Sequence, residues 1–159
     1  NRPTRLCPSP SGDLYVSDGY RNSRVHRFSA DGELIHSWGI PGGSAPSEIY
    51  SPHSVWVDGE GFVYVCDRKN DRIQIFSPAG EFVNQWADVP GATDIYMVDD
   101  ETVYVAERQG GSESWITVRN KQGHVLERWA SPMAHQIRVD AHGDIYMALS
   151  TSVGKYVRK

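Results

Sequence analysis

The sequence predicts an all-β fold, a β-propeller built from four-stranded blades, and two repeated patterns carry this prediction. A strand pattern centred on a tyrosine recurs at intervals of 49, 40 and 42 residues, at Tyr15, Tyr64, Tyr104 and Tyr146. A second pattern, which ends in tryptophan, follows the first three of these strands over residues 28–38, 76–86 and 119–129. Units of about 40 residues that contain four short strands are typical of propeller blades. Because no stretch shows a sustained 3.6-residue apolar periodicity, helices are not expected.

The strands can be placed in order along the chain. We expect complete blades over residues 1–39, 52–87 and 93–130, a partial fourth blade over 134–159, and a turn-rich insertion over 40–51, all within one propeller domain or segment. Clusters of Gly, Pro, Asn and Asp separate runs rich in Val, Ile, Tyr, Phe and Trp. In the second blade the strands are expected near His53–Asp58, Phe62–Asp67, Arg72–Phe76 and Glu81–Trp86. In the fourth they are expected near His135–Val139, Asp144–Leu149 and Val153–Val157.

A ring with a partial fourth blade would leave sheet edges and blade faces exposed, which closure of a propeller normally prevents. Three arrangements are therefore open: an incomplete four-bladed ring, a homo-oligomer that completes the ring, or a segment of a longer protein. The blade count of the working molecule does not follow from the repeats alone.

Composition and charge exclude some classes of protein. The 159 residues carry 16 Lys and Arg against 20 Asp and Glu, and this net charge of −4 disfavours nucleic acid as a partner. No apolar run approaches the roughly 20 residues of a membrane helix, so no membrane partner is expected. The two cysteines, Cys7 and Cys66, are too few for a disulfide framework or an all-cysteine zinc site. An extracellular or periplasmic location is expected if the start at Asn1 is processed, and a cytoplasmic one otherwise.

The first strand of each blade lines the central channel of a propeller, so equivalent positions form a ring. Counting back from each blade tyrosine, and assuming a shorter turn in the third blade, assigns this column to Thr4, His53, Asp94 and His135. Two histidines on alternate blades could contribute imidazoles to a metal ion on the channel axis. The alternative is that both histidines cap strands or bind water in the channel.

Several segments carry a resemblance to a known family. They are Asn1-Arg-Pro-Thr4, Asp18-Gly-Tyr-Arg-Asn-Ser-Arg-Val25, Pro52-His-Ser54, Asp67-Arg-Lys-Asn-Asp-Arg-Ile-Gln74 and Met133-Ala-His-Gln136. Their sequence pattern resembles NHL repeats and, more closely, the lyase domain of peptidylglycine amidation, peptidyl-α-hydroxyglycine α-amidating lyase. The resemblance is dense up to about residue 87 and then thins until Met133. It covers only part of a six-bladed enzyme.

The resemblance implies a zinc-dependent carbon–nitrogen lyase. His53 and His135 would be zinc ligands, and Met133 would lie against the metal pocket. Asp94 and Thr4, from the channel column counted above, are expected to line the same pocket. Tyr20 would assist removal of a proton from the substrate hydroxyl, and Arg68 would hold the substrate carboxylate. The alternatives are structural: Tyr20 covers its blade, while Arg68 pairs with Asp67 or Asp71. Arg108 follows Glu107 as Arg68 follows Asp67, which favours a role repeated in each blade.

The chain also departs from that family. No third zinc histidine is present, and Gln136 stands where the family has an aspartate that serves a calcium ion, so calcium is not expected. Ala134 replaces the proline between Met133 and His135, and Arg21 stands where animal enzymes have a cysteine.

Because one metal ligand is missing, a binding or scaffold module takes precedence over the metal-dependent lyase. This module would hold a peptide or protein on its loop face, with aromatic and arginine anchors at Tyr20, Arg21, Tyr50, Arg68 and Arg108. The lyase with zinc is the alternative, and an RNA-binding surface ranks third because of the acidic balance.

Overall fold

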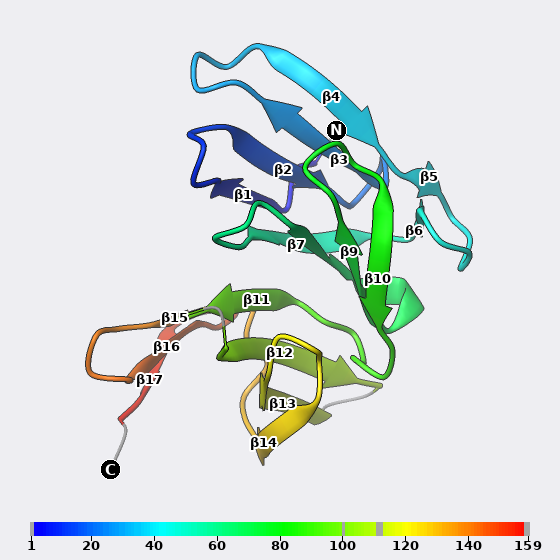
Figure 1. Cartoon of the computed structure of the whole chain (residues 1–159). Helices are drawn as coiled ribbons and strands as arrows, with labels where there is room; N and C mark the ends of the chain where they lie inside the picture. The colour runs from blue at the N-terminus through cyan, green and yellow to red at the C-terminus, as the bar shows by residue number, and fades with distance from the viewer. Residues whose placement is uncertain (1, 100, 111–112, 158–159) are drawn as a thin grey trace. The chain divides into compact units, whose positions relative to one another are not determined.

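The computed structural model describes residues 2–99, 101–110 and 113–157, and its regular secondary structure is almost entirely β-strand. One short 3-10 turn, η1 (Arg68–Asn70), interrupts the strands of the described chain. The chain folds as two compact units, unit 1 (Asn1–Gly91) and unit 2 (Ala92–Lys159), and each unit is described by itself (Figure 1). None of the helical segments in the described part of the chain is long and apolar enough to cross a membrane.

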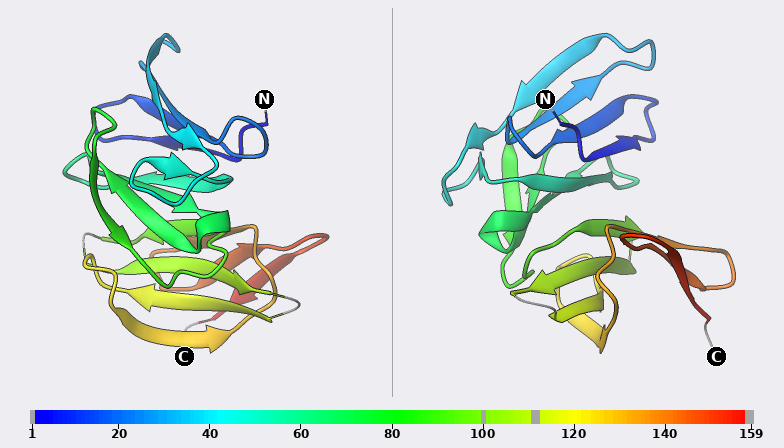
Figure 2. Two further views of the ribbon diagram at one scale, coloured as in Figure 1. Left: turned by 90° about the vertical axis from the view of Figure 1, so that its right-hand side faces the viewer. Right: turned by 180° about the vertical axis from the view of Figure 1, so that it is seen from behind.

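Unit 1 contains two complete blades, each a four-stranded antiparallel sheet in simple sequence order (Figure 1; Figure 2). The first blade consists of β1 (Arg5–Pro8), β2 (Leu14–Asp18), β3 (Arg24–Phe28) and β4 (Leu34–Trp38). The second consists of β7 (Pro52–Val57), β8 (Val63–Asp67), β9 (Arg72–Phe76) and β10 (Phe82–Trp86). The predicted strands of the second blade are confirmed to within one residue at either end.

The insertion between these blades folds back on itself. Its ends pair as the short parallel strands β5 (Ile40–Pro41) and β6 (Glu48–Ile49). Three side chains of the second blade bind backbone groups of the insertion: Asn70 donates to the Gly43 carbonyl, Arg72 donates to the carbonyls of residues 44, 45 and 48, and Gln74 binds at residues 47 and 48.

Unit 2 contains one complete blade and a three-stranded sheet. The complete blade consists of β11 (Asp94–Met97), β12 (Val103–Gln109), β13 (Glu113–Arg119) and β14 (Val125–Ala130). The three-stranded sheet consists of β15 (Gln136–Val139), β16 (Ile145–Ala148) and β17 (Val153–Tyr156). Three complete blades and a partial fourth were predicted, and this is the composition observed.

Aromatic packing explains why the tyrosine and tryptophan columns recur. Tyr15 and Trp38 of the first blade are buried, and their ring centroids lie 6.1 Å apart in an edge-to-face arrangement. In the second blade Tyr64 and Trp86 are buried with ring centroids 5.5 Å apart. Such pairs bury large apolar areas and favour this geometry. The repeated columns therefore form the cores of the blades.

The strand register corrects one assignment made from the sequence. The backbone N–H groups of Thr4, Thr93 and His135 each donate to the strand residue two positions after the blade tyrosine, Ser17, Ala106 and Ala148 respectively. Asp94 lies one position further along and pairs with Ala106. The column is therefore Thr4, His53, Thr93 and His135, and placing Asp94 in it was wrong. The error arose from assuming a shortened turn, whereas the eleven-residue spacing before the tyrosine is kept in every blade.

Candidate functional site

A hydrogen-bonded pair of side chains in unit 1, Tyr20 and His53, joins the loop after β2 to the start of β7. The Tyr20 hydroxyl is 3.0 Å from Nε2 of His53, and the two rings meet edge to face at 5.7 Å between centroids. His53 is buried, at 5% exposure, whereas Tyr20 is 49% exposed. The pair thus connects a buried imidazole to the protein surface through a phenol.

Local backbone structure brings these two residues together. His53 occupies an irregularity in the register of β7 and β8, where the pairing shifts between Pro52 and Ser54. Bulges of this kind redirect a side chain and are frequent beside functional sites. Gly19 permits the loop that carries Tyr20 to approach, because a Cβ at position 19 would stand 1.9 Å from the Pro52 carbonyl oxygen.

Thr4, at the start of the first blade, also contacts the Pro52 carbonyl that the Tyr20 loop approaches. The Thr4 hydroxyl is 2.8 Å from the Pro52 carbonyl oxygen and 2.8 Å from Oγ of Ser17. The hydroxyl therefore joins the inner edge of one blade to the next. Thr93 repeats this role in unit 2, where its hydroxyl donates to the Ala134 carbonyl at 2.7 Å. Thr4 thus positions the site, and its predicted place in a pocket stays a prediction.

Asp18 holds the base of the Tyr20 loop. Its buried carboxylate accepts hydrogen bonds from the side-chain amide of Asn22 and from the backbone N–H of Arg2, and Nε2 of His26 lies 3.6 Å from it. Burial by itself raises the pKa of Asp18, but these hydrogen bonds and His26 outweigh it and hold the pKa below its ordinary value. The loop is therefore fastened by an ionised carboxylate.

Further predicted anchors lie in loops of unit 1 that backbone hydrogen bonds connect to one another. Tyr50 is exposed, and its backbone lies against the turn after β8, because its N–H donates to Asp67 and its carbonyl accepts from the N–H of Lys69. The next residue along, Ser51, contacts Ser23 of the Tyr20 loop through its N–H. Arg21 is exposed within that loop, and Arg68 opens η1. We call the residues Tyr20, Arg21, Tyr50 and Arg68 the loop face of unit 1.

The arginine that pairs with the buried Asp67 is Arg72. Its Nε donates to Asp67 Oδ2 at 2.8 Å, and both side chains are almost fully buried. The sequence suggested Arg68 for this role, and Arg72 was missed. The register contains a signal for it, because Arg72 stands directly opposite Asp67 across the β8–β9 turn.

The predicted site residues of unit 2 are Asp94, Arg108, Met133 and His135. Asp94 is fully buried, and its Oδ2 accepts hydrogen bonds from the backbone N–H of Ile137 and from Arg138, which joins β11 to β15. Met133, His135 and Arg108 are partly buried. The Glu107 carboxylate before Arg108 is bound by Thr117 and Arg119. The predicted roles of these residues stay predictions.

The metal prediction depends on residues of different units. His53 belongs to unit 1 and His135 to unit 2, so a shared metal ion between them stays a prediction. Within the described ranges, the structure gathers no group of three His, Cys, Asp or Glu side chains that could hold a metal ion. The described residues therefore do not form a three-ligand zinc site.

The sheets and the repeated columns define a β-propeller. The model of the NHL repeat family matches residues 1–28 and 50–76, which include the loop of Tyr20 and the strand of His53. A solved streptogramin B lyase shares the fold over 99% of this chain and 55% of its own, with a TM-score of 0.68 and 12% identity.

Three curated relatives are similar in sequence over about half of the chain. Peptidyl-glycine alpha-amidating monooxygenase B of Xenopus laevis is 40% identical over 90 residues, which are 53% of this chain and 10% of that protein. NHL repeat-containing protein 3 of Homo sapiens is 36% identical over 89 residues, 54% of this chain and 25% of that protein. A probable peptidyl-alpha-hydroxyglycine alpha-amidating lyase of Caenorhabditis elegans is 37% identical over 78 residues, 48% of this chain and 22% of that protein. The chain thus spans a quarter or less of the length of these relatives.

Proposed function

We propose that this chain is a binding module that holds the carboxylate end of a peptide on the loop face of unit 1. The observation that carries the proposal is the half-exposed Tyr20 ring, which is fixed in place by its hydrogen bond to the buried His53. An aromatic side chain with a fixed orientation contributes contact area at little entropic cost, as in the anchors of known interfaces.

The charges of the loop face support a ligand with a carboxylate. Arg21 follows Tyr20 in the same loop, Arg68 opens η1, and hydrogen bonds of Tyr50 and Ser51 connect these two loops. The planar fork of an arginine suits a carboxylate, with which it forms paired charge-assisted hydrogen bonds. The charges of this face therefore support a peptide that ends in a free carboxylate as its ligand.

Fluorescence anisotropy of a fluorescein-labelled tripeptide with a free carboxylate tests the proposal. The same tripeptide with an amidated end is the control ligand. We expect Tyr20→Ala, Arg21→Ala and Arg68→Ala each to weaken binding about tenfold or more, which is about 1.4 kcal/mol. Lys155→Gln, which removes one positive charge in unit 2, should leave binding unchanged.

Two results would overturn the proposal. One is equal binding of the acid and the amide, and the other is binding that the three loop-face variants leave unchanged. Thermal unfolding distinguishes a binding role from a structural one at Arg21, because an exposed side chain outside the core changes stability by about 0.5 kcal/mol or less. A large loss of stability in Arg21→Ala would assign this residue to the fold.

A second candidate function is a metal-dependent lyase of the amidating type. Similarity to two amidating proteins and the juxtaposition of Tyr20 and His53 favour it. However, the described residues do not bring three metal ligands together. A lyase of this type would need ligands beyond those that unit 1 or unit 2 gathers by itself.

Metal analysis of untagged protein tests this candidate. It predicts about one zinc ion per site and the loss of that zinc in both His53→Ala and His135→Ala. Release of glyoxylate from an α-hydroxyglycine peptide should then accompany the zinc. Substoichiometric zinc in the unaltered protein would reject the lyase and leave the binding module standing.

A further inference from the structure

One position of the repeat carries a histidine in the first blade and neutral side chains in the other complete blades. This position lies on the third strand, opposite the residue that follows the blade tyrosine, and it holds His26, Gln74 and Thr117. Each of these side chains contacts the buried acid three residues after the tyrosine, which is Asp18, Asp67 and Glu107 in turn. The first blade therefore has a titratable group where the others have an amide and a hydroxyl.

The His26 ring lies between two oxygen atoms. Its Nε2 is 3.6 Å from Oδ2 of Asp18, and its Nδ1 is 2.7 Å from Oγ of Ser37, which stands directly opposite on β4. A neutral imidazole carries one N–H, whereas a protonated imidazole carries two and a positive charge. Protonation thus places an N–H on each side of the ring and a cation beside the Asp18 carboxylate.

The buried acids of the other complete blades have charged partners that do not depend on pH. Arg72 lies 2.8 Å from the acid of the second blade, and Arg119 lies 2.7 Å from the acid of the third. Within the described residues, the ion-pair partner that the structure gives Asp18 is His26. Because a guanidinium is always charged and an imidazole changes its charge between about pH 5 and 8, the first blade has an ion pair that forms on acidification.

Other charged and titratable groups near His26 come from three segments. On its own strand, Arg24 lies on the same face of β3, where its charge opposes protonation, but its side chain is exposed and solvent screens it. On β4, Ser37 is neutral, and His36 lies on the opposite face, stacked on the blade tryptophan. The segment before β1 provides the backbone N–H of Arg2, whose side chain is exposed. The buried carboxylate is therefore the main charge that acts on the imidazole.

The same carboxylate anchors the loop that carries Tyr20. Its Oδ2, which faces His26, also accepts a hydrogen bond from the side-chain amide of Asn22 in that loop. Burial raises the pKa of Asp18, but the hydrogen bonds and His26 outweigh it and hold the pKa below 3.8. Asp18 is thus ionised throughout the range in which imidazoles titrate.

We propose that His26 and Asp18 form a pH-dependent latch for the Tyr20 loop, residues 19–23. As pH falls from about 8 to 5, His26 takes up a proton and binds the carboxylate as a cation, so the loop is held more tightly. The sign follows from linkage, because a proton bound more strongly in the latched state stabilises that state at acidic pH, and this contribution is lost as pH rises. The latch acts on the loop itself and does not depend on the function proposed for unit 1.

Hydrogen exchange of the full chain at about pH 5.5 and pH 7.5 tests the latch, with each rate divided by the intrinsic rate at that pH. We expect the loop amides to be about two- to fivefold better protected at the lower pH, as for a partly exposed ion pair. His26→Gln introduces the side chain of the second blade and should make protection equal at the two pH values. The control His142→Gln removes an exposed imidazole of unit 2 and should leave the response of the loop unchanged.

Thermal unfolding provides an independent measurement. The Tm of the unaltered protein should exceed that of His26→Gln by about 1–3 °C more at the lower pH than at the higher one. Asp18→Asn, which removes the charge and keeps the shape of the side chain, should also abolish the pH response of the loop. The proposal is overturned if loop protection in the unaltered protein does not rise on acidification. It is equally overturned if the rise persists in His26→Gln, which would assign the response to another group such as His53.

Discussion

The buried carboxylates of Asp67 in β8 and Glu107 in β12 occupy equivalent positions in the two units, three residues after the blade tyrosine, yet they bind different parts of the chain. In unit 1, Asp67 accepts hydrogen bonds from Arg72, Gln74, Asn70 and the backbone N–H of Tyr50. In unit 2, Glu107 accepts from Thr117 and Arg119 of the neighbouring strand. Both acids are buried and paired with an arginine, but only the Asp67 network continues into an insertion.

This difference shows that the same position of the repeat can stabilise different local structures in different blades. In both blades the donors that bind the acid come from the third strand: Arg72 stands directly opposite Asp67, whereas Thr117 and Arg119 stand opposite Val105 and Val103 and reach Glu107 from there. Arg72 has donors left over after binding Asp67, and they bind the carbonyls of the insertion. Arg119 instead donates to the Gly123 carbonyl in the turn of its own blade. An arginine that pairs with the buried acid, although from a different position of the third strand, therefore organises an added loop in one unit and an ordinary turn in the other.

Replacing Arg72 by Met should cause the largest loss of stability among the changes predicted here, because it removes the contacts that distinguish the Asp67 network from that of Glu107. The substitution leaves the Asp67 carboxylate buried without its charged partner, which costs about 3–5 kcal/mol of unfolding free energy. Urea unfolding measures the loss, and hydrogen exchange should show faster exchange of amides in residues 42–48. Arg119→Met in unit 2 should destabilise comparably while exchange in the insertion stays slow. Unchanged exchange of the insertion in Arg72→Met would contradict the role assigned to this arginine.

Two glycines at equivalent turns sharpen a second contrast, between a turn that covers a tryptophan and one that does not. Gly32 and Gly80 both have a positive φ, of 86° and 84°, but a Cβ at Gly32 meets no atom within 4 Å whereas one at Gly80 meets Trp38. Gly32→Ala should cost about 1 kcal/mol from the backbone alone. Gly80→Ala should cost about 1–3 kcal/mol more, because the buried indole must shift. Equal losses in thermal or urea unfolding would show that the turn does not press on Trp38.

The smallest expected effect concerns the first blade, where the contribution of Asp18 to stability should depend on pH. Its pKa in the folded protein lies below the ordinary value of 3.8, so the ionised carboxylate stabilises the fold above that pH and loses this contribution as pH falls through the lowered value. Asp18→Asn should therefore destabilise the protein by about 1 kcal/mol near pH 7. The difference from the unaltered protein should shrink below about pH 3.5. A difference that stays constant from pH 7 to about pH 3 would exclude this role.

Much of the fold could be predicted from the sequence, because the tyrosine and tryptophan columns, the alternating strands and the turn glycines agree with one another. The error at Asp94 came from a presumed deletion in a turn, where the constant spacing before Tyr104 would have given Thr93. At the site, the resemblance singled out Tyr20 and His53 separately, and the structure shows them hydrogen-bonded to each other.

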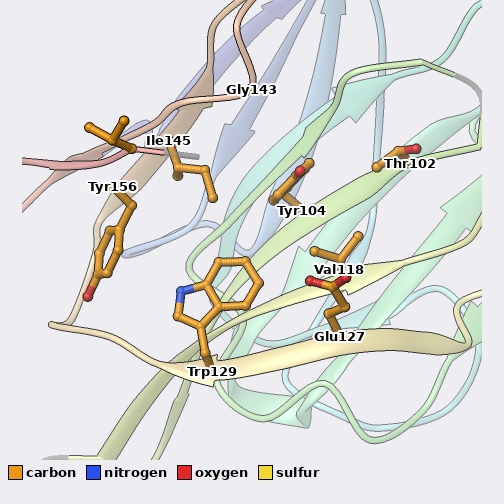
Figure 3. A pocket seen from close by; sticks show the side chains of 9 residues that line it. Thr102, Tyr104, Val118, Glu127, Trp129, Gly143, Ile145 and Tyr156 are labelled. Carbon is orange, nitrogen blue, oxygen red and sulfur yellow. The ribbon is translucent and has the colours of Figure 1, made fainter. Parts of the chain in front are cut away.

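Other features could not be predicted from the repeat pattern. The bonds from Arg72 to the insertion depend on the path of a loop that has no counterpart in the other blades. The groove that Trp129 lines in unit 2 is formed by side chains of two neighbouring sheets (Figure 3). A pattern read within one blade does not predict how the surface of the next blade packs against it.

The way in which the insertion is held has a consequence for sequence variation. Asn70 and Arg72 bind its main-chain oxygens, which every amino acid provides, and the side chains of Ser44, Ala45 and Pro46 are exposed. The path of this loop is thus largely independent of the identity of those three residues. Homologues can diverge here without repacking a blade, and foreign residues grafted at these positions would be displayed on a backbone whose course is already set.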